Sequence, residues 1–278
     1  MARKPLMVIP VGAPVQQAAF DLVTTIIEAV AAADEQLQDG DVLAVSSKYS
    51  AISQGRVITL DDIVVTPLAA QLAERYHLNP KMAQLVVQEA DHIFGGIPGF
   101  LLTYKDGILS PNAGIDRSNI PNGYAVLFPH APYQTAADLR RALRERLGVD
   151  VGIILTDSWL MPARLGTTGV ALATAGFKPI QDERGKQDLF GNPMQVTQRG
   201  MADAICQSAQ LVMGERDEAT PLAIVRNTGV ELADLELGVD DVAIDWRMCI
   251  YVQSLTAGLL VESLETVPSN GYKTEALR

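Results

Sequence analysis

The sequence predicts an α+β fold in which mixed or antiparallel sheets are flanked by helices. Short strand patterns and amphipathic helix patterns are intermingled along the 278 residues, and they do not alternate regularly as in a doubly wound parallel sheet. Two strand patterns, 99–103 and 108–109, are joined by a Lys-Asp-Gly turn and therefore predict a hairpin. The sequence has no fixed-period repeat and no dividing linker, so we expect a single unit over 1–278 with a loose tail at 268–278.

The first half of the chain is expected to contain three helices and two strands besides the hairpin. Apolar residues recur at helical spacing between Phe20 and Val30 and predict the first helix. The turn signal Asp39-Gly40 precedes a buried strand. In chain order, the expected elements are a strand at 7–10, a helix at 17–33, a strand at 42–45, and helices at 67–76 and 80–92.

The second half carries two helix patterns, two strand patterns and a long apolar segment near the C-terminus. The expected elements are a basic amphipathic helix over 135–147, a strand at 151–155, a helix over 200–213, a strand at 222–225 and a helix over 240–262. We interpret the charges of the helix 135–147 as a solvated face rather than a binding patch. The C-terminal helix is apolar enough to pack on the core or on a partner subunit.

The composition indicates an ordinary globular protein with an acidic surface. The net charge is −11, from 22 Lys and Arg against 33 Asp and Glu, which argues against a nucleic-acid partner. No stretch has the length of a membrane span and no apolar run of signal-peptide length opens the chain, so we expect no membrane partner and a cytoplasmic setting. Cys206 and Cys249 lie far apart in apolar helical contexts and are expected to be buried free thiols.

The common phosphate-binding and catalytic motifs are absent from the sequence. There is no GxxxxGK[ST] loop, no GxGxxG after a strand, no HExxH and no Gly-x-Ser-x-Gly elbow. The three histidines, at 77, 92 and 130, are expected to be structural or to lie at the surface. Because an acidic protein can bind phosphates when a metal ion supplies positive charge, the carboxylates become the candidates.

Three acidic segments are candidates for such a site. Asp116 lies in the polar run Asn112–Asn119, where the alternative is an Asx-turn or a helix cap. Asp157 follows a buried strand with Ser158 beside it, an arrangement common at magnesium or manganese sites, and the alternative is an N-cap. Glu215 follows an apolar helix, and its alternative is a surface glutamate. The three carboxylates would hold divalent metal against phosphate oxygens if they converge, which their spacing alone does not establish.

Together, these segments and several others resemble the coenzyme F420-0:L-glutamate ligase family, also called F420 gamma-glutamyl ligase. The resemblance extends from about Pro10 to Asn227, and its motifs keep their order and spacing with few gaps. The motifs that carry it are Asp39–Leu43, Gln54–Arg56, Asn112–Asn119, Thr156-Asp157, Gly185–Gly191, Val196-Thr197, Met201–Asp203 and Leu211–Glu215.

The resemblance implies an enzyme that joins the amino group of L-glutamate to a carboxylate of F420-0 while GTP is cleaved to GDP and phosphate. It implies two Mg²⁺ or Mn²⁺ sites, one held by Asp116 and Asp157 and a second that Ser158 and Glu215 help to hold. The expected catalytic residues are Asp116, Asp157 and Arg164. Since phosphoryl transfer to the acid gives an acyl phosphate that the amine attacks, no side-chain nucleophile is required.

The resemblance also implies where the nucleotide lies and how the chain assembles. The residues expected at the nucleotide are Val11, Gly12, Ala13, Pro14, Ser47, Lys48, Asn119, Met213, Gly214 and Arg216. The family is further similar in forming an intertwined homodimer and in using a monovalent cation, here expected to be K⁺. The single unit of this chain is expected to consist of two interleaved subdomains.

The sequence departs from the family pattern at two positions where cations are expected. Ile52 replaces a lysine that would meet phosphate, although the neighbouring Lys48 could reach in. Met161 replaces an arginine, whereas Arg164 of the same run is kept. Three alternatives therefore stay open: a ligase of the same fold with a different acid or amine, a nucleotide- or metal-binding protein without turnover, and a metal-dependent phosphohydrolase.

Overall fold

A five-stranded mixed sheet lies at the centre of the computed structural model, which describes residues 4–256. The strand order is β1 (Met7–Val11), β12 (Leu222–Arg226), β2 (Val42–Ser46), β8 (Gly152–Leu160) and β9 (Thr167–Ala175). β2 and β8 run parallel, and the other neighbouring pairs are antiparallel. The inner strands are apolar on both faces because both faces are covered. This mixed sheet with its helices confirms the predicted α+β class.

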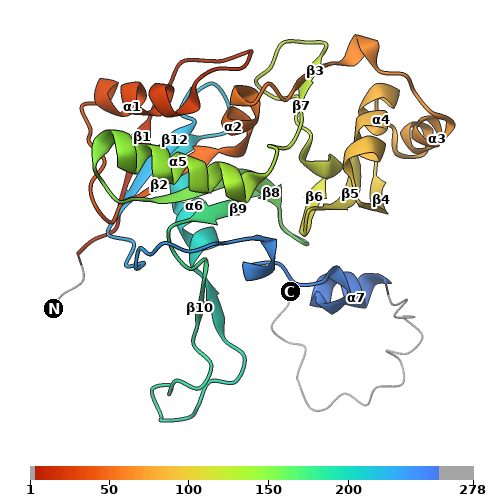
Figure 1. The fold of residues 1–278 in the computed structure, drawn as a ribbon. Coiled ribbons are helices and arrows are strands. Elements are labelled where there is room, and N and C mark those ends of the chain that lie inside the picture. The colour runs from red at the N-terminus through yellow and green to blue at the C-terminus, as the bar shows by residue number, and fades with distance from the viewer. Residues whose placement is uncertain (1–3, 257–278) are drawn as a thin grey trace. The chain divides into compact units, whose positions relative to one another are not determined.

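Helices cover both faces of the central sheet (Figure 1). α1 (Leu22–Ala32) and α5 (Pro132–Leu147) pack on one face, where Leu43 contributes to their shared apolar cluster. α6 (Met201–Met213) packs on the other face, against a cluster that includes Val42. Neighbouring residues of one strand thus contact opposite layers, as the pleat of a strand requires.

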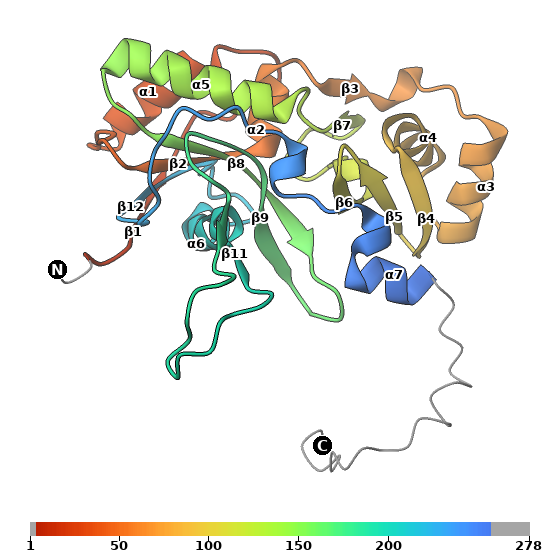
Figure 2. The ribbon, with the colours of Figure 1, turned by 60° about the horizontal axis from the view of Figure 1, so that its bottom comes forward.

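A smaller antiparallel sheet with two helices stands beside the central sheet (Figure 2). It consists of β4 (His92–Ile97), β5 (Phe100–Lys105) and β6 (Ile108–Pro111), with α3 (Pro67–Tyr76) and α4 (Pro80–Glu89) packed nearby. The β5–β6 pair confirms the predicted hairpin. The 3₁₀ turn η2 (Asn112–Gly114) follows β6. The strand before this region, β3 (Val57–Thr59), pairs antiparallel with the strand after it, β7 (Tyr124–Val126).

A long arm extends away from the central sheet in both views (Figures 1 and 2). Its base is the antiparallel pair β10 (Ile180–Asp182) and β11 (Gln198–Gly200). Leu189 and Phe190 lie far along it and are almost fully exposed. Val196, on the same arm, is exposed as well, so the arm carries several large apolar side chains at its surface.

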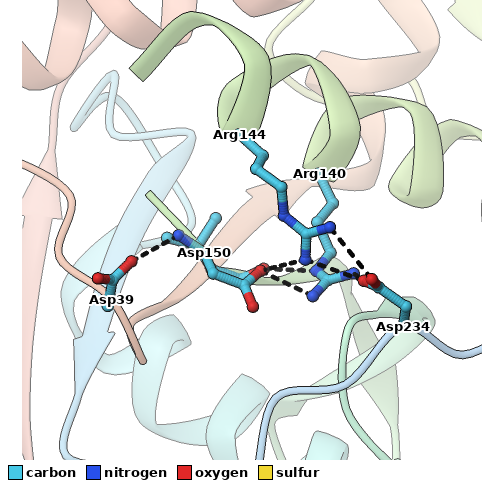
Figure 3. A network of polar contacts seen from close by, with 6 residues as sticks. Asp39, Arg140, Arg144, Asp150 and Asp234 are labelled. Atoms are coloured by element: carbon cyan, nitrogen blue, oxygen red, sulfur yellow. Dashed lines mark hydrogen bonds and ion pairs between the residues drawn. The ribbon is translucent and has the colours of Figure 1, made fainter. Parts of the chain in front are cut away.

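An ion-pair network fixes α5 to the rest of the unit (Figure 3). Arg140 is only 8% exposed, donates to the Val151 carbonyl, and pairs with Asp150 and Asp234. Arg144 pairs with the same two carboxylates. The prediction of a purely solvated charged face is therefore wrong for Arg140, because its partners lie on other segments that helical periodicity does not reveal.

Three helices differ in length from the prediction, and one of them is α5, which begins at Pro132 and not at residue 135. α1 begins at Leu22 rather than at residue 17, because the Asp21 carboxylate accepts the Thr24 N–H and caps the helix there. α4 ends at Glu89, and His92 already belongs to a strand.

The segment Thr156–Ser158 lies inside a strand and not after one. β8 continues to Leu160, and Asp157 is opposite Val170 of β9. The irregular register between Leu155 and Thr156 interrupts the pairing just before the polar residues begin. The apolar run predicted only the first half of the strand, since its second half is polar.

The described C-terminal region contains short turns instead of one long helix. The 3₁₀ turns η3 (Val239–Asp241) and η4 (Trp246–Met248) interrupt the predicted helix, and α7 (Ile250–Thr256) follows them. The Asp245 side chain accepts the Arg247 N–H and starts η4. The remainder of the predicted helix and the tail at 268–278 lie outside the described residues.

Contacts divide the chain into two compact units, Met1–Ala243 and Ile244–Arg278. All the sheets belong to the first unit. Among residues 4–256, no helix has the length and apolar character needed to cross a membrane. Cys206 is a buried free thiol as predicted, whereas Cys249 is only half-buried.

Candidate functional site

A cavity of about 720 Å³ in the first unit is lined by residues from both sheets. The segments that contribute are the turn after β1, the junction between β2 and α2 (Ser47–Ser53), the β5–β6–η2 region, the loop up to Asn119, the second half of β8 and the stretch from Gln210 to Pro221. A second void of about 20 Å³ has Lys48, Asp116 and Asp157 in its wall as well. Its size suits one water molecule or one bare ion.

Lys48 and Asp116 form an ion pair in the wall of both cavities. The Asp116 backbone is fixed by reciprocal hydrogen bonds with Val126, at 3.0 and 2.9 Å. Its carboxylate accepts hydrogen bonds from the Ser118 N–H and hydroxyl, so the Asx-type turn is present. Burial alone would raise the pKa of Asp116, but the Lys48 ammonium and Ser118 hold that pKa below its usual value.

Asp157 lines the same cavity, but its pKa is shifted in the opposite direction to that of Asp116. Desolvation, together with the negative charge of Asp116, raises the pKa of its carboxyl to about 6. The Ser158 N–H and the Ser47 hydroxyl bond to the carboxylate and partly oppose this shift. No N-cap is formed, since Asp157 lies in a strand. A desolvated carboxylate with so little compensation fits a place where a cation binds.

Ser158 belongs to a separate cluster because neighbouring strand residues face opposite sides. Its hydroxyl donates to Glu215, and the Gln210 amide of α6 donates to both. The Thr167 hydroxyl reaches the same Glu215 oxygen at 3.4 Å. The pair assigned to one metal by resemblance thus lies on the α2 side of β8, and the pair assigned to the second lies on the α6 side.

Backbone contacts join the segments expected to bind the nucleotide. The Ala13 N–H donates to the Ala219 carbonyl at 3.0 Å, and the Ser46 N–H donates to the Pro221 carbonyl at 2.8 Å. The Tyr49 hydroxyl donates to the Pro14 carbonyl at 2.9 Å. Three stretches that are distant in sequence therefore form one continuous part of the wall.

The structure places most of the predicted nucleotide residues at the cavities. Those in a wall are Ala13, Pro14, Ser47, Lys48, Asn119, Met213, Gly214 and Arg216. Val11 is fully buried in β1, and neither Val11 nor Gly12 lines the cavity. The predicted catalytic Arg164 is exposed in the β8–β9 connection and is also outside the cavity lining, as is Met161.

Ile52 combines two environments. It lines the large cavity, yet it is only 5% exposed and packs with Ala51 and Val126 in a small apolar cluster. This packing explains how an apolar residue is accommodated at a position where the family pattern has lysine. Lys48, one helical turn earlier, and Arg216 are cations that do line the cavity.

The oxygen atoms of the site are suitable ligands for hard cations, although they are spread over the cavity wall. Among residues 4–256, no group of three His, Cys, Asp or Glu side chains is close enough together to hold a metal ion by itself. Asp116 and Asp157 do share both cavities, and hydroxyl and carboxylate oxygens of Ser158 and Glu215 line the larger one. Such a site can hold Mg²⁺ or Mn²⁺ through one or two carboxylates when substrate phosphates supply the remaining ligands.

Several cavity residues were missed by the sequence analysis. The Gln210 amide donates hydrogen bonds to both Ser158 and Glu215. Nothing in the sequence around Gln210, on an apolar helix five residues before Glu215, indicated that it belongs to the site. Phe100 and Ser110 come from the hairpin, which looked purely structural. These residues line the cavity only because two sheets meet there, and a local sequence pattern does not reveal such a contact.

Comparison with known proteins identifies relatives of this chain. Residues 11–227 match the family described as F420-0:Gamma-glutamyl ligase. A coenzyme F420:L-glutamate ligase of Methanopyrus kandleri is 40% identical over 202 residues, which covers 72% of this chain and 80% of the relative. Proteins of that name from Methanothermobacter thermautotrophicus and Methanocaldococcus jannaschii are each 33% identical, over 77% and 70% of this chain and 86% and 78% of their own lengths.

Proposed function

The chain belongs to the F420-0:gamma-glutamyl ligase family, and from that premise we propose that it is a metal-dependent, GTP-consuming ligase that adds L-glutamate to F420-0. Its relatives are named for the ligation of L-glutamate to coenzyme F420. The single observation that carries the proposal is the shared cavity, because one wall joins the expected nucleotide segments and Asp116 and Asp157 lie in the same wall. Proteins of one fold can differ in activity, so the activity is inferred from the residues of the site and not from the fold.

In the proposed reaction, an oxygen of the acid's carboxylate attacks the γ-phosphorus of GTP. The bond from that phosphorus to the bridging oxygen breaks, and GDP leaves with the electron pair. The amino group of L-glutamate then attacks the acyl carbon, an amide bond forms, phosphate departs, and the amine loses a proton. Both steps need charge neutralisation and alignment more than a protein nucleophile.

Asp116 and Asp157 are proposed to hold one Mg²⁺ or Mn²⁺, and Ser158 and Glu215 to help hold a second. When bound, the metal ions neutralise charge on the phosphate oxygens. The Lys48 ammonium, placed between Asp116 and Ser118, is the side chain we assign to the nucleotide phosphates. Its ion pair with Asp116 keeps both groups in the cavity wall before substrates bind.

Two finer properties extend the proposal. The family resemblance supports a homodimer and the use of K⁺, and the cavity provides room for small-molecule substrates. A coupled assay in which KCl is replaced by NaCl at equal ionic strength measures the cation requirement. Lower turnover in NaCl is the expected result.

Alternative chemistries keep the same cavity but change what enters it. Ile52 and Met161, which replace expected cations, favour either a ligase with another acid or amine or a binding protein without turnover. A metal-dependent phosphohydrolase would use the carboxylates and water. Each alternative predicts a different product.

One assay separates these alternatives. Purified protein is incubated with GTP or ATP, Mg²⁺ or Mn²⁺, L-glutamate and F420-0, and the products are identified by mass. Glutamylated F420-0 formed together with phosphate supports the ligase. Phosphate released without L-glutamate indicates hydrolysis, and nucleotide binding without turnover indicates a binding protein.

A further inference from the structure

The β6–η2 part of the cavity wall contains hydrogen-bonding groups that the protein leaves without partners. Ser110 lines the cavity and is 1% exposed, and its hydroxyl has no hydrogen-bond partner among residues 4–256. Asn112 also lines the cavity. Its side-chain oxygen accepts the Leu101 N–H at 2.8 Å, while its amide NH₂ makes no hydrogen bond within the described residues. Buried polar groups are rarely left unpaired, so the buried Ser110 hydroxyl beside a cavity points to a ligand, and the half-buried Asn112 amide can donate to the same ligand.

The backbone here is held in a costly conformation. Asn112, Ala113 and Gly114 have consecutive φ values of 51°, 54° and 69°, a left-handed conformation that is unfavourable for a non-glycine residue such as Ala113. The Thr103 hydroxyl fixes the segment, since it donates to the Ser110 carbonyl and accepts the Ala113 N–H. The result is a rigid presentation of Ser110 and Asn112 that packing alone would not require.

The surroundings of these donors favour one of the three substrates. Phe100 and Leu160, each about half-exposed, line the same cavity and offer apolar surface. The nucleotide wall is built by other segments, near β1, α2 and β12. L-Glutamate is small and highly charged, so it has little apolar surface to place against Phe100 and Leu160. An acid with an apolar body matches the combination of neutral donors and apolar walls.

We propose that Ser110 and Asn112 donate hydrogen bonds to a carboxyl or carbonyl oxygen of the acid co-substrate, with Phe100 covering its apolar part. This assignment rests on the proposed ligase function and adds the subsite at which the acid is selected. It also explains why the protein tolerates an unpaired buried hydroxyl, because the partner arrives with the substrate.

Two conservative variants test the subsite. Ser110→Ala removes the hydroxyl. Asn112→Asp keeps an oxygen for the Leu101 N–H and a residue type that tolerates positive φ, but it removes the NH₂ donor and repels a carboxylate. We expect the KM for F420-0 to rise roughly tenfold or more in each variant, as the loss of one hydrogen bond to a charged group implies. The KM values for GTP and L-glutamate should change less than about twofold.

Ser50→Ala is the matched control. Ser50 is also fully buried with an unpartnered hydroxyl, but it does not line the cavity, so no KM should change. Thermal unfolding separates a structural role from a binding role. Removal of an unpartnered buried hydroxyl should leave Tm unchanged or higher in Ser110→Ala, since no hydrogen bond is lost.

Failure of the subsite is distinguishable from failure of the ligase proposal. If the wild-type protein forms glutamylated F420-0 and both variants keep its KM for F420-0, the subsite assignment is wrong. A rise confined to the KM for GTP or for L-glutamate overturns it as well. If the wild type forms no product, the ligase proposal fails, and calorimetric titration with F420-0 still decides the subsite: equal affinity of wild type and variants contradicts it.

Discussion

Asp116 and Asp157 lie in one cavity but have opposite pKa displacements. Lys48 and Ser118 compensate the charge of Asp116, whereas Asp157 is desolvated and sits near a second negative charge. A bound divalent cation would remove that imbalance, which is why these two residues remain the centre of the proposed site. The sequence singled out both aspartates, but it could not reveal that one of them is paired and the other is not.

Replacing Asp157 by asparagine tests the metal assignment. We expect Asp157→Asn to lower turnover at least about a hundredfold and to weaken Mn²⁺ binding measured by electron paramagnetic resonance, because a carboxylate ligand is lost. Asp203→Asn is the control, since Asp203 is a desolvated carboxylate with a raised pKa that accepts the Ala171 N–H outside the cavity. Full activity and full Mn²⁺ affinity in Asp157→Asn would contradict the assignment of Asp157 as a metal ligand.

Ile52→Lys tests whether the departure from the family pattern is a loss or a specialisation. The site is only 5% exposed and apolar, so we expect a lower Tm from disturbed packing, with a cost of about 1–3 kcal/mol. We also expect tighter GTP binding by calorimetry, because the new ammonium can extend into the cavity. Ile52→Met controls for packing. Unchanged GTP affinity in the lysine variant would argue against a phosphate role for this position.

At the scale of elements, α5 illustrates what a local pattern conceals. Its apolar face was predictable, but Arg140 and Arg144 meet Asp150 and Asp234 from segments before and after the central strands. Figure 3 also shows Asp39 accepting the Asp150 N–H, which ties the β2 turn to the same network. Such contacts position β8, the strand that carries Asp157, and only the fold reveals them.

The network makes a pH-dependent contribution to stability. The arginines lower the pKa of Asp234 to about 2, below its usual 3.8, so the stabilisation is present above about pH 4 and is lost as the pH falls toward 2. We expect Asp234→Asn to reduce the urea midpoint at pH 6, with the difference from wild type shrinking as the pH is lowered toward 3. Asp182→Asn is the control, because Asp182 pairs with Arg184 only two residues away and this contact does not join distant segments of the fold. A pH-independent difference for Asp234→Asn would contradict this account.

Element type was more predictable than element extent. Periodic apolar patterns located α3, α6 and the β5–β6 hairpin, whereas β8 was predicted too short because its second half is polar. The prediction for the C-terminal segment was wrong for another reason. Its apolar composition suggested a continuous helix, but Asp245 starts a separate 3₁₀ turn within it.

At the scale of the whole molecule, the site arises where two sheets of the first unit both contribute to one cavity. The fold class and the chemistry-bearing segments could be predicted, because strand patterns and the family motifs are local. The convergence could not, since Asp116, Ser158 and Glu215 are brought near the cavity by pairing between strands far apart in sequence. Arg164 is the counterexample, as the motif contains it but the fold leaves it outside the cavity lining.

The proposed homodimer is a property of the whole molecule that a mass measurement tests. Light scattering coupled to size exclusion should give about twice the monomer mass. The exposed apolar side chains of the β10–β11 arm are consistent with a surface that is covered in an assembly. A monomer mass at micromolar concentration would contradict the expected dimer.

The most direct test of the account is the product formed from GTP, Mg²⁺, L-glutamate and F420-0. We expect one glutamylated F420-0 and one phosphate per turnover, no product when the divalent metal is chelated, and recovery when Mg²⁺ or Mn²⁺ is restored. Phosphate release that continues without L-glutamate, or a glutamylated product that forms in the presence of chelator, would contradict it.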